Sequence, residues 1–369
     1  KTYNGWVPPA NYRLDEEDPN YIKSFSVDEE EEYYQFFKEC GFVVIRDIIP
    51  PEDCDATVDE IWKYISSVTS DDIQQNDPNT WNTDLWPTKK TGILGSRVVD
   101  DKMAWKNRSS PDLHRVYSKL YGTSELVISL DRYNIMRPTK NVDFGNGIIK
   151  DMPEWKGLES WFHWDLNPWY WTGISKPTQE PEMYEEHGLL FSRNLVNLIT
   201  EGNNTPKRHP DSQKLQGLVA LGDTPFSTGG FQCVPGFVGD TLKQWSLKNQ
   251  KLEETYKDRH FVGVPKDDPL IECTQVVPLK KGSLVVWSSE LPHCNRLNNS
   301  ELFRYCQYIK MVPIADLHDV EGRAIVVSNS LKRGFCYQQH SNNPVFGLHL
   351  KEKKKSKSLP VISITSFIS

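Results

Sequence analysis

The sequence feature that most constrains the fold is a histidine and an aspartate two residues apart, with a second histidine far along the chain. His163 and Asp165 lie in residues 160–165, SWFHWD, an aromatic and apolar stretch that is typical of a β-strand. Residues i and i+2 of a strand share a face, so both side chains are expected to point the same way. His293 follows 128 residues after Asp165. A fold that uses these residues together must bring two distant segments side by side.

Two imidazoles and one carboxylate are a ligand set for a divalent metal. Three protein ligands of this kind form the facial triad of non-haem Fe(II) centres and leave coordination positions open. The alternatives are a strand-surface pair bonded to its neighbours for His163 and Asp165, and a turn histidine after Pro292 for His293. Arg304 follows His293 by 11 residues. It is either an ordinary salt-bridge partner or, if it points inward, a cation that requires an anion.

The hydrophobic pattern predicts many short strands, with helices towards the N-terminus. Acidic residues at the start of 28–40 and the prolines at 50 and 51 are typical helix start signals. Apolar runs between turn residues predict the strands. We expect helices at about 28–40, 50–67, 111–120 and 239–247, and strands at about 41–45, 125–136, 160–165, 216–223, 229–236, 274–278, 282–288 and 303–313. This order favours a β-sandwich or barrel that helices support.

Three segments lie outside this pattern. Residues 1–30 are polar and contain prolines, which predicts an extended arm. Residues 173–212 are rich in Pro, Glu and Asn and are long for a connection in a compact core, so we expect a lid or insertion there. Residues 316–369 form a C-terminal extension. Its basic run, KEKKKSK at 351–357, is typical of a solvated tail, with nucleic-acid binding or targeting as the alternative.

Several motifs occur in the order that characterises a known family. They are the strand at 216–223, the turn GGFQCVPGF at 229–237, KGSLVVW at 281–287, LPH ending at His293, Arg304, and MVP at 311–313. With the His-x-Asp pair, this succession resembles the phytanoyl-CoA dioxygenase-like family of Fe(II)/2-oxoglutarate oxygenases over about residues 30–315. The resemblance implies a mainly β fold with flanking helices, a cupin-like double-stranded β-helix, or jelly roll.

The resemblance also implies one oxygenase domain over residues 1–369. We expect helical support at about 28–122 and a jelly-roll core at about 123–315, with the lid-like insertion at 173–212 over the mouth of the site. Two positions depart from the family pattern. Phe237 stands where Ser usually follows Pro-Gly, and Ser283 stands in place of the Asp of Gly-Asp. Both positions are structural in the family, so the implied chemistry is unaffected.

The matching residues of the family are metal ligands and co-substrate contacts. By resemblance, His163, Asp165 and His293 are the catalytic ligands of Fe(II). Arg304 is then expected to grip the far carboxylate of 2-oxoglutarate, which its planar two-donor fork suits. On the preceding strand, either Asn134 or Arg132 is expected to face inward, Asn134 beside the co-substrate and Arg132 beside the substrate.

The implied reaction oxidises a C–H bond of a small molecule with O₂, by hydroxylation, desaturation or cyclisation, and releases succinate and CO₂. We expect a specialised metabolite or an amino-acid or lipid derivative as substrate. Trp169 and Trp171 either wall the substrate pocket or pack in the core, whereas Trp164 is expected in the core. Two alternatives stay open: a 2-oxoglutarate-dependent hydroxylase of a protein or nucleic-acid group, and a non-catalytic jelly-roll binding protein.

Composition narrows the class of partner and compartment. A net charge of −7 and a pI near 5.8 disfavour nucleic acid as the main partner. No apolar run approaches the length of a membrane span. Seven cysteines without regular spacing favour reduced thiols. We therefore expect a cytoplasmic protein without membrane attachment. A leader removed before Lys1 is the alternative, and the sequence leaves the oligomeric state open.

Overall fold

The computed structural model describes residues 5–8, 14–94, 101–175 and 215–316, apart from positions 71, 83, 89, 159, 160, 258 and 260. It also describes the backbone of residues 183–186 and 189–192, and positions 328 and 331. Most of the predicted insertion at 173–212 and of the predicted C-terminal extension therefore lies outside the described residues, including the basic run at 351–357.

The first sheet is antiparallel and buried on both faces. Its strand order is β1-β13-β9-β15-β3. Because helices cover one face and the second sheet faces the other, its strands are rich in apolar residues without strict alternation. The bounds are β1 (Phe42–Ile45), β13 (Leu284–Ser288), β9 (Leu215–Ala220), β15 (Arg304–Tyr308) and β3 (Tyr133–Met136).

The second sheet is also antiparallel and is built from very short strands, in the order β11-β6-β14-β10-β12. The bounds are β11 (Val262–Gly263), β6 (His163–Trp164), β14 (His293–Asn295), β10 (Phe231–Cys233) and β12 (Gln275–Val276). Trp287 of the first sheet contacts Phe231 and His293 of the second, with ring centroids 4.4 and 5.3 Å apart. The two sheets therefore enclose a shared interior.

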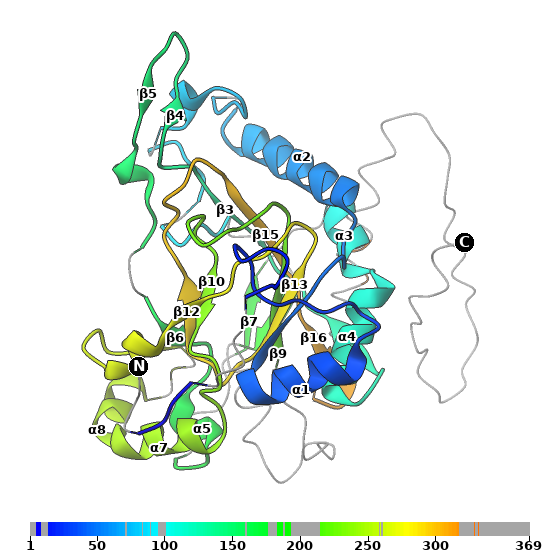
Figure 1. The fold of residues 1–369 in the computed structure, drawn as a ribbon, viewed down its shortest axis with the longest axis vertical. Helices are drawn as coiled ribbons and strands as arrows, with labels where there is room; N and C mark the ends of the chain where they lie inside the picture. The colour runs from blue at the N-terminus through cyan, green and yellow to red at the C-terminus, as the bar shows by residue number, and fades with distance from the viewer. Residues whose placement is uncertain are drawn as a thin grey trace.

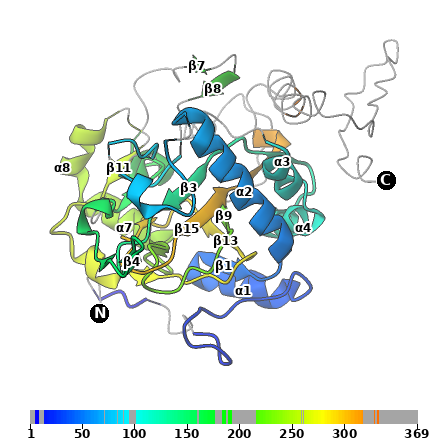
Figure 2. The same ribbon diagram turned by 90° about the horizontal axis from the view of Figure 1, so that it is seen from above.

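Helices near the N-terminus support the outer face of the first sheet (Figures 1 and 2). Trp62 Nε1 donates to Tyr305 Oη at 2.9 Å, and Asn107 Nδ2 donates to Gln307 Oε1 at 2.9 Å. On the other side of the molecule, α5 and α7 lie against each other (Figure 1). The helix bounds are α1 (Glu30–Cys40), α2 (Pro51–Val68), α3 (Lys102–Arg108), α4 (Pro111–Tyr121), α5 (Pro168–Trp171), α7 (Asp240–Lys248) and α8 (Gln250–Glu253).

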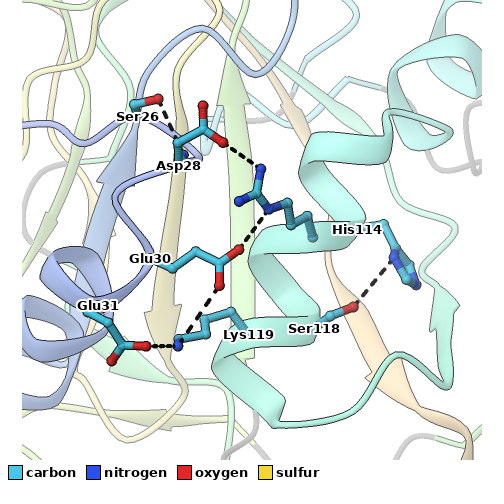
Figure 3. A network of polar contacts seen from close by, with 8 residues as sticks. Ser26, Asp28, Glu30, Glu31, His114, Ser118 and Lys119 are labelled. Atoms are coloured by element: carbon cyan, nitrogen blue, oxygen red, sulfur yellow. Dashed lines mark hydrogen bonds and ion pairs between the residues drawn. The ribbon is translucent and has the colours of Figure 1, made fainter.

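Acidic residues at the start of α1 face basic residues of α4 (Figure 3). Arg115 binds Asp28 and Glu30, each at 2.7 Å, and Lys119 binds Glu31. Every pair includes at least one side chain that is 45% or more exposed, so each pair contributes little to stability. The pairs fix the relative direction of two helices that also meet through apolar contacts.

The predicted helices are present within a few residues of their expected bounds, but several predicted strands are wrong in length. Those expected at 160–165, 229–236 and 274–278 are reduced to β6, β10 and β12, and two others are each divided. The expected strand at 125–136 is divided into β2 (Leu126–Ile128) and β3, and the one at 303–313 into β15 and β16 (Met311–Pro313). In both, the chain changes partners: β2 pairs with β16, whereas β3 pairs with β15. Ser129 N donates to Lys310 O at 2.8 Å, where both strands break.

Smaller elements complete the described part of the chain. Asp101 caps α3, which the sequence did not lead us to expect, by accepting from Ala104 N at 2.9 Å. No helix among the described residues is long and apolar enough to cross a membrane. The remaining bounds are β4 (Val142–Asp143), β5 (Ile149–Lys150), β7 (Met183–Glu186), β8 (Leu189–Ser192), and the 3₁₀ turns Pro78–Thr80, Pro153–Trp155, Glu254–Tyr256, Pro269–Cys273 and Ile314–Asp316.

A carboxyl pair connects α2 to α3 and to the outer face of β3. Glu60 Oε2 accepts from Met103 N at 2.9 Å, and Asp101 Oδ1 accepts from Tyr133 Oη at 2.8 Å. Glu60 and Asp101 are also hydrogen-bonded to each other, which requires a proton on one of them. Burial, followed by the contact with Asp101, raises the pKa of Glu60 to about 8.

This pair predicts a pH-dependent stability. Because the folded-state pKa of Glu60 is raised, its contribution is fully present below the unfolded pKa of about 4.3 and is lost as the pH rises through about 8. Glu60→Gln keeps a neutral hydrogen-bonding group, so we expect its Tm to exceed that of the wild type at pH 9 by on the order of 2 °C, and not at pH 5. Thermal unfolding followed by circular dichroism at both pH values measures this, with Glu52→Gln on the exposed side of α2 as control. Parallel pH profiles for wild type and Glu60→Gln would contradict the pairing.

Candidate metal centre

Two strands and the bend after one of them bring His163, Asp165 and His293 together. His163 in β6 and His293 in β14 are direct register partners, and Asp165 follows β6. Asp165 Oδ1 lies 3.5 Å from His163 Nε2, and Asp165 Oδ2 lies 3.4 Å from His293 Nε2. The three ligand atoms all lie within 4.8 Å of one another. This geometry can hold one metal ion.

The same local hydrogen bond orients both imidazoles. His163 Nδ1 lies 2.9 Å from Trp161 O, and His293 Nδ1 lies 3.0 Å from Leu291 O, so each ring is bonded to the carbonyl two residues before it. A carbonyl only accepts, so Nδ1 carries the proton in the neutral ring. Nε2 of each ring is then the atom that points towards Asp165, either as a donor to the carboxylate or as a ligand of a metal ion. A backbone carbonyl on the non-ligating nitrogen is the usual way in which proteins orient a metal-binding histidine.

The electrostatics of the site favour the protonation states that a metal requires. Burial would raise the pKa of Asp165, but hydrogen bonds and charge interactions with His163 and His293 outweigh it and hold that pKa well below its ordinary value. Burial is the largest cause of the lowered pKa of His293, followed by the opposing bond to Asp165. An ionised carboxylate and a neutral imidazole are the metal-binding forms of these groups.

The site is open on the side of the carboxylate. The imidazole side chains of His163 and His293 are only 6% and 7% exposed, whereas the Asp165 side chain is 44% exposed. Asp165 is therefore the member of the group through which the centre contacts solvent.

A polar network lies between the two sheets next to this centre. Arg304 Nη1 donates to Asn134 Oδ1 at 2.6 Å. Tyr308 Oη accepts from Asn134 Nδ2 at 3.3 Å and from Asn295 Nδ2 at 3.2 Å. Asn295 stands two residues after His293 on β14, so the network joins the metal-binding strand to the strand that carries Arg304.

Arg304 is a buried cation without a carboxylate partner among the described residues. Its exposure is 1%, and its contacts are to the neutral groups of Asn134 and Tyr308. A buried charge without a counter-ion is costly, so the interior at this point is suited to an anion. The alternative reading of Arg304 as an ordinary salt-bridge partner finds no support in these contacts.

The remaining candidate residues differ in burial and in the groups they contact. Asn134 faces inward and contacts Arg304, whereas Arg132 precedes β3, is partly exposed and has its Nε 3.7 Å from Asp131 Oδ1. Trp169 is fully buried, and its Nε1 donates to Ser246 O at 2.8 Å. The ring therefore packs in the core, and a role for Trp169 beside a substrate stays a prediction.

Two more aromatic candidates lie at different depths. Trp171 is partly exposed at the end of α5 and packs against the core, and a role for it beside a substrate stays a prediction. Trp164 is buried, and its Nε1 donates to Glu290 O at 2.8 Å, in agreement with the expected core position.

Sequence reasoning did not identify Tyr308 and Asn295 as members of the site. The signal was present in the strand period, because Arg304, Cys306 and Tyr308 alternate along β15 and share a face. His293 and Asn295 share a face of β14 for the same reason. Counting along each strand in steps of two residues, from Arg304 and from His293, would have selected Tyr308 and Asn295.

Comparison with known proteins agrees with the motif pattern. No family model matches the chain. A Dictyostelium discoideum protein named "Putative phytanoyl-CoA dioxygenase" is 29% identical over 332 residues, which cover 84% of this chain and 88% of that protein. The "Ava biosynthesis cluster protein O" of Aspergillus versicolor is 23% identical over 284 residues, which cover 76% of each chain.

A solved structure is similar at a lower level. The "Putative Oxidoreductase from Salmonella typhimurium LT2" is 14% identical, with a TM-score of 0.49, over 79% of this chain and 73% of that chain. The Dictyostelium relative spans most of both sequences and confirms the resemblance predicted from the motifs. Over most of its length, the chain is thus similar to the phytanoyl-CoA dioxygenase-like proteins.

Proposed function

We propose that this protein is an Fe(II)/2-oxoglutarate-dependent dioxygenase that oxidises a C–H bond of a small molecule. The observation that carries the proposal is a hydrogen-bond network that connects the candidate metal ligands to Arg304, a buried cation without a carboxylate partner among the described residues. His293 and Asn295 lie on one strand, Asn295 donates to Tyr308, and Tyr308 lies on the same strand as Arg304. A dicarboxylate co-substrate could bind the metal ion with one carboxylate and Arg304 with the other.

The donor set fits Fe(II). His163, Asp165 and His293 would hold the ion through two neutral nitrogens and one carboxylate, the ligands of the facial triad. When bound, Fe(II) supplies the oxidation of the substrate by O₂, coupled to the conversion of 2-oxoglutarate to succinate and CO₂. The chain itself orients both imidazoles through Trp161 O and Leu291 O.

The far carboxylate of 2-oxoglutarate is assigned to Arg304. A guanidinium matches a carboxylate with two parallel donors, and a charge-assisted bond is stronger in a buried site. Asn134 holds the Arg304 side chain from one side. The Tyr308 hydroxyl, which accepts from two asparagines, has its own proton available for an oxygen of the co-substrate.

We also assign the jelly-roll form of the fold. The chain crosses repeatedly between the two sheets, with β3, β9, β13 and β15 in the first and β6, β10 and β14 in the second, and β11 and β12 also in the second. Such crossing between antiparallel sheets is how a double-sheet jelly roll is built. We propose one oxygenase domain, whose insertion at 173–212 lies mostly outside the described residues.

The substrate is assigned only to a class. It is a small molecule, a specialised metabolite or an amino-acid or lipid derivative, that is hydroxylated, desaturated or cyclised. The open side at Asp165 leaves room for it next to the metal.

Loss of a ligand histidine tests the metal assignment. His163→Ala removes one of three donors, so we expect at least a 100-fold weaker affinity for Fe(II), since even the partners of ligands account for about 10–100-fold. Anaerobic metal titration and 2-oxoglutarate-dependent succinate formation are the measurements. His114→Ala, which alters a partly exposed histidine on α4, is the control. Unchanged succinate formation by His163→Ala would refute the assignment.

Replacement of the buried arginine tests the co-substrate assignment. Arg304→Gln should raise the apparent KM for 2-oxoglutarate by on the order of 10- to 100-fold, since bonds to charged groups contribute about 1.5–3 kcal/mol. Arg115→Gln, which alters a surface arginine, should leave that KM unchanged. The Tm of Arg304→Gln should not fall in the absence of co-substrate, because the buried cation has no carboxylate partner among the described residues. An unchanged KM with a lowered Tm would instead assign Arg304 a structural role.

A further inference from the structure

One of the two ligand histidines has an aromatic ring on each face. The His163 imidazole lies between Trp161, with centroids 4.6 Å apart and planes at 13°, and Phe261, with centroids 4.5 Å apart and planes at 24°. The neighbours of His293 are tilted instead: Trp287 at 5.3 Å and 59°, and Phe231 at 5.9 Å and 37°. His293 is therefore held by core packing, and His163 by a stack of three rings.

The outer ring of this stack comes from an edge strand. Val262 pairs with Trp164 and Gly263 pairs with His163, where β11 meets β6. The same register, continued by one residue, places Phe261 opposite Asp165, on the face that carries the metal-binding side chains. Phe261 is 44% exposed, so one face of its ring covers His163 and much of the rest is in contact with solvent.

We infer that Phe261 is a positioning residue for the metal ligand His163, an inference that rests on the proposed metal site. An imidazole that binds a divalent cation gives up electron density and becomes positively polarised. The faces of aromatic rings carry negative potential, so two stacked faces stabilise the metal-bound imidazole more than the free one. The stack also restricts rotation of the imidazole, so less conformational freedom is lost when the metal binds.

The exposure of Phe261 separates this role from ordinary packing. A fully buried phenylalanine contributes to folding mainly through the apolar area it removes from water. Phe261 keeps nearly half of its surface exposed, whereas Trp161 is partly buried and also supplies the carbonyl that bonds His163 Nδ1. Substitution of Phe261 should therefore change metal affinity more than it changes stability.

The test compares Phe261→Leu with Phe261→Tyr in the full chain. Leucine keeps apolar bulk without a ring face, and tyrosine keeps the face. We expect Phe261→Leu to weaken Co(II) binding about 10-fold, the lower end for residues that support a ligand, and Phe261→Tyr to stay within about 2-fold of the wild type. Anaerobic titration followed by the visible absorption of Co(II) gives both the affinity and the ligand geometry. Leu247→Ala, at a residue of α7 with 43% exposure, is the matched control.

The outcomes distinguish this inference from the proposed function. A wild-type chain that binds no Co(II) contradicts the metal site itself. If the wild type binds Co(II) and Phe261→Leu binds it equally well, Phe261 does not position His163. Equal losses in Phe261→Leu and Phe261→Tyr also overturn the inference, because the ring face would then be irrelevant. If Phe261→Leu does not fold, as judged by its thermal transition, Phe261→Met replaces it with the same two expected results.

Discussion

The geometry of the candidate metal centre depends on one backbone contact, the pairing of β6 with β14 through His163 and His293. The second sheet consists of strands of two or three residues, so few ladder bonds hold it, and its order comes from the first sheet against which it packs. Trp287 and Phe231 bridge the two sheets next to His293. The long strands therefore provide the stability that the short, metal-binding strands lack.

Sequence reasoning located the three side chains that gather at the candidate site better than it located the strands around them. His163, Asp165 and His293 could be selected from residue type and order, because their chemistry is independent of strand length. The strand at 160–165 was expected to carry His163 and Asp165 on one face, yet β6 ends at Trp164 and Asp165 lies in the following bend. The breaks near Ser129 and Lys310 escaped prediction because they arise from a change of partner strand, which hydrophobic pattern alone does not encode.

Contacts that depend on tertiary structure were the least predictable. Asn134 was one of two candidates until the register of β3 with β15 placed it against Arg304. Trp169 was equally compatible with pocket and core, and packing beside α7 decided for the core. Phe261 gave no signal, because its significance comes from an edge strand of two residues that forms only next to β6. Motifs therefore pointed to the candidate centre, whereas the residues packed around it came only from the tertiary structure.

The isolation of Arg304 has a consequence for the lifetime of the folded chain. A buried guanidinium without a carboxylate among the described residues makes the interior less stable until an anion arrives. A ligand that binds only the folded state stabilises it in proportion to the logarithm of its concentration. Resistance to unfolding and to proteolysis would then rise with the concentration of the anion that Arg304 binds.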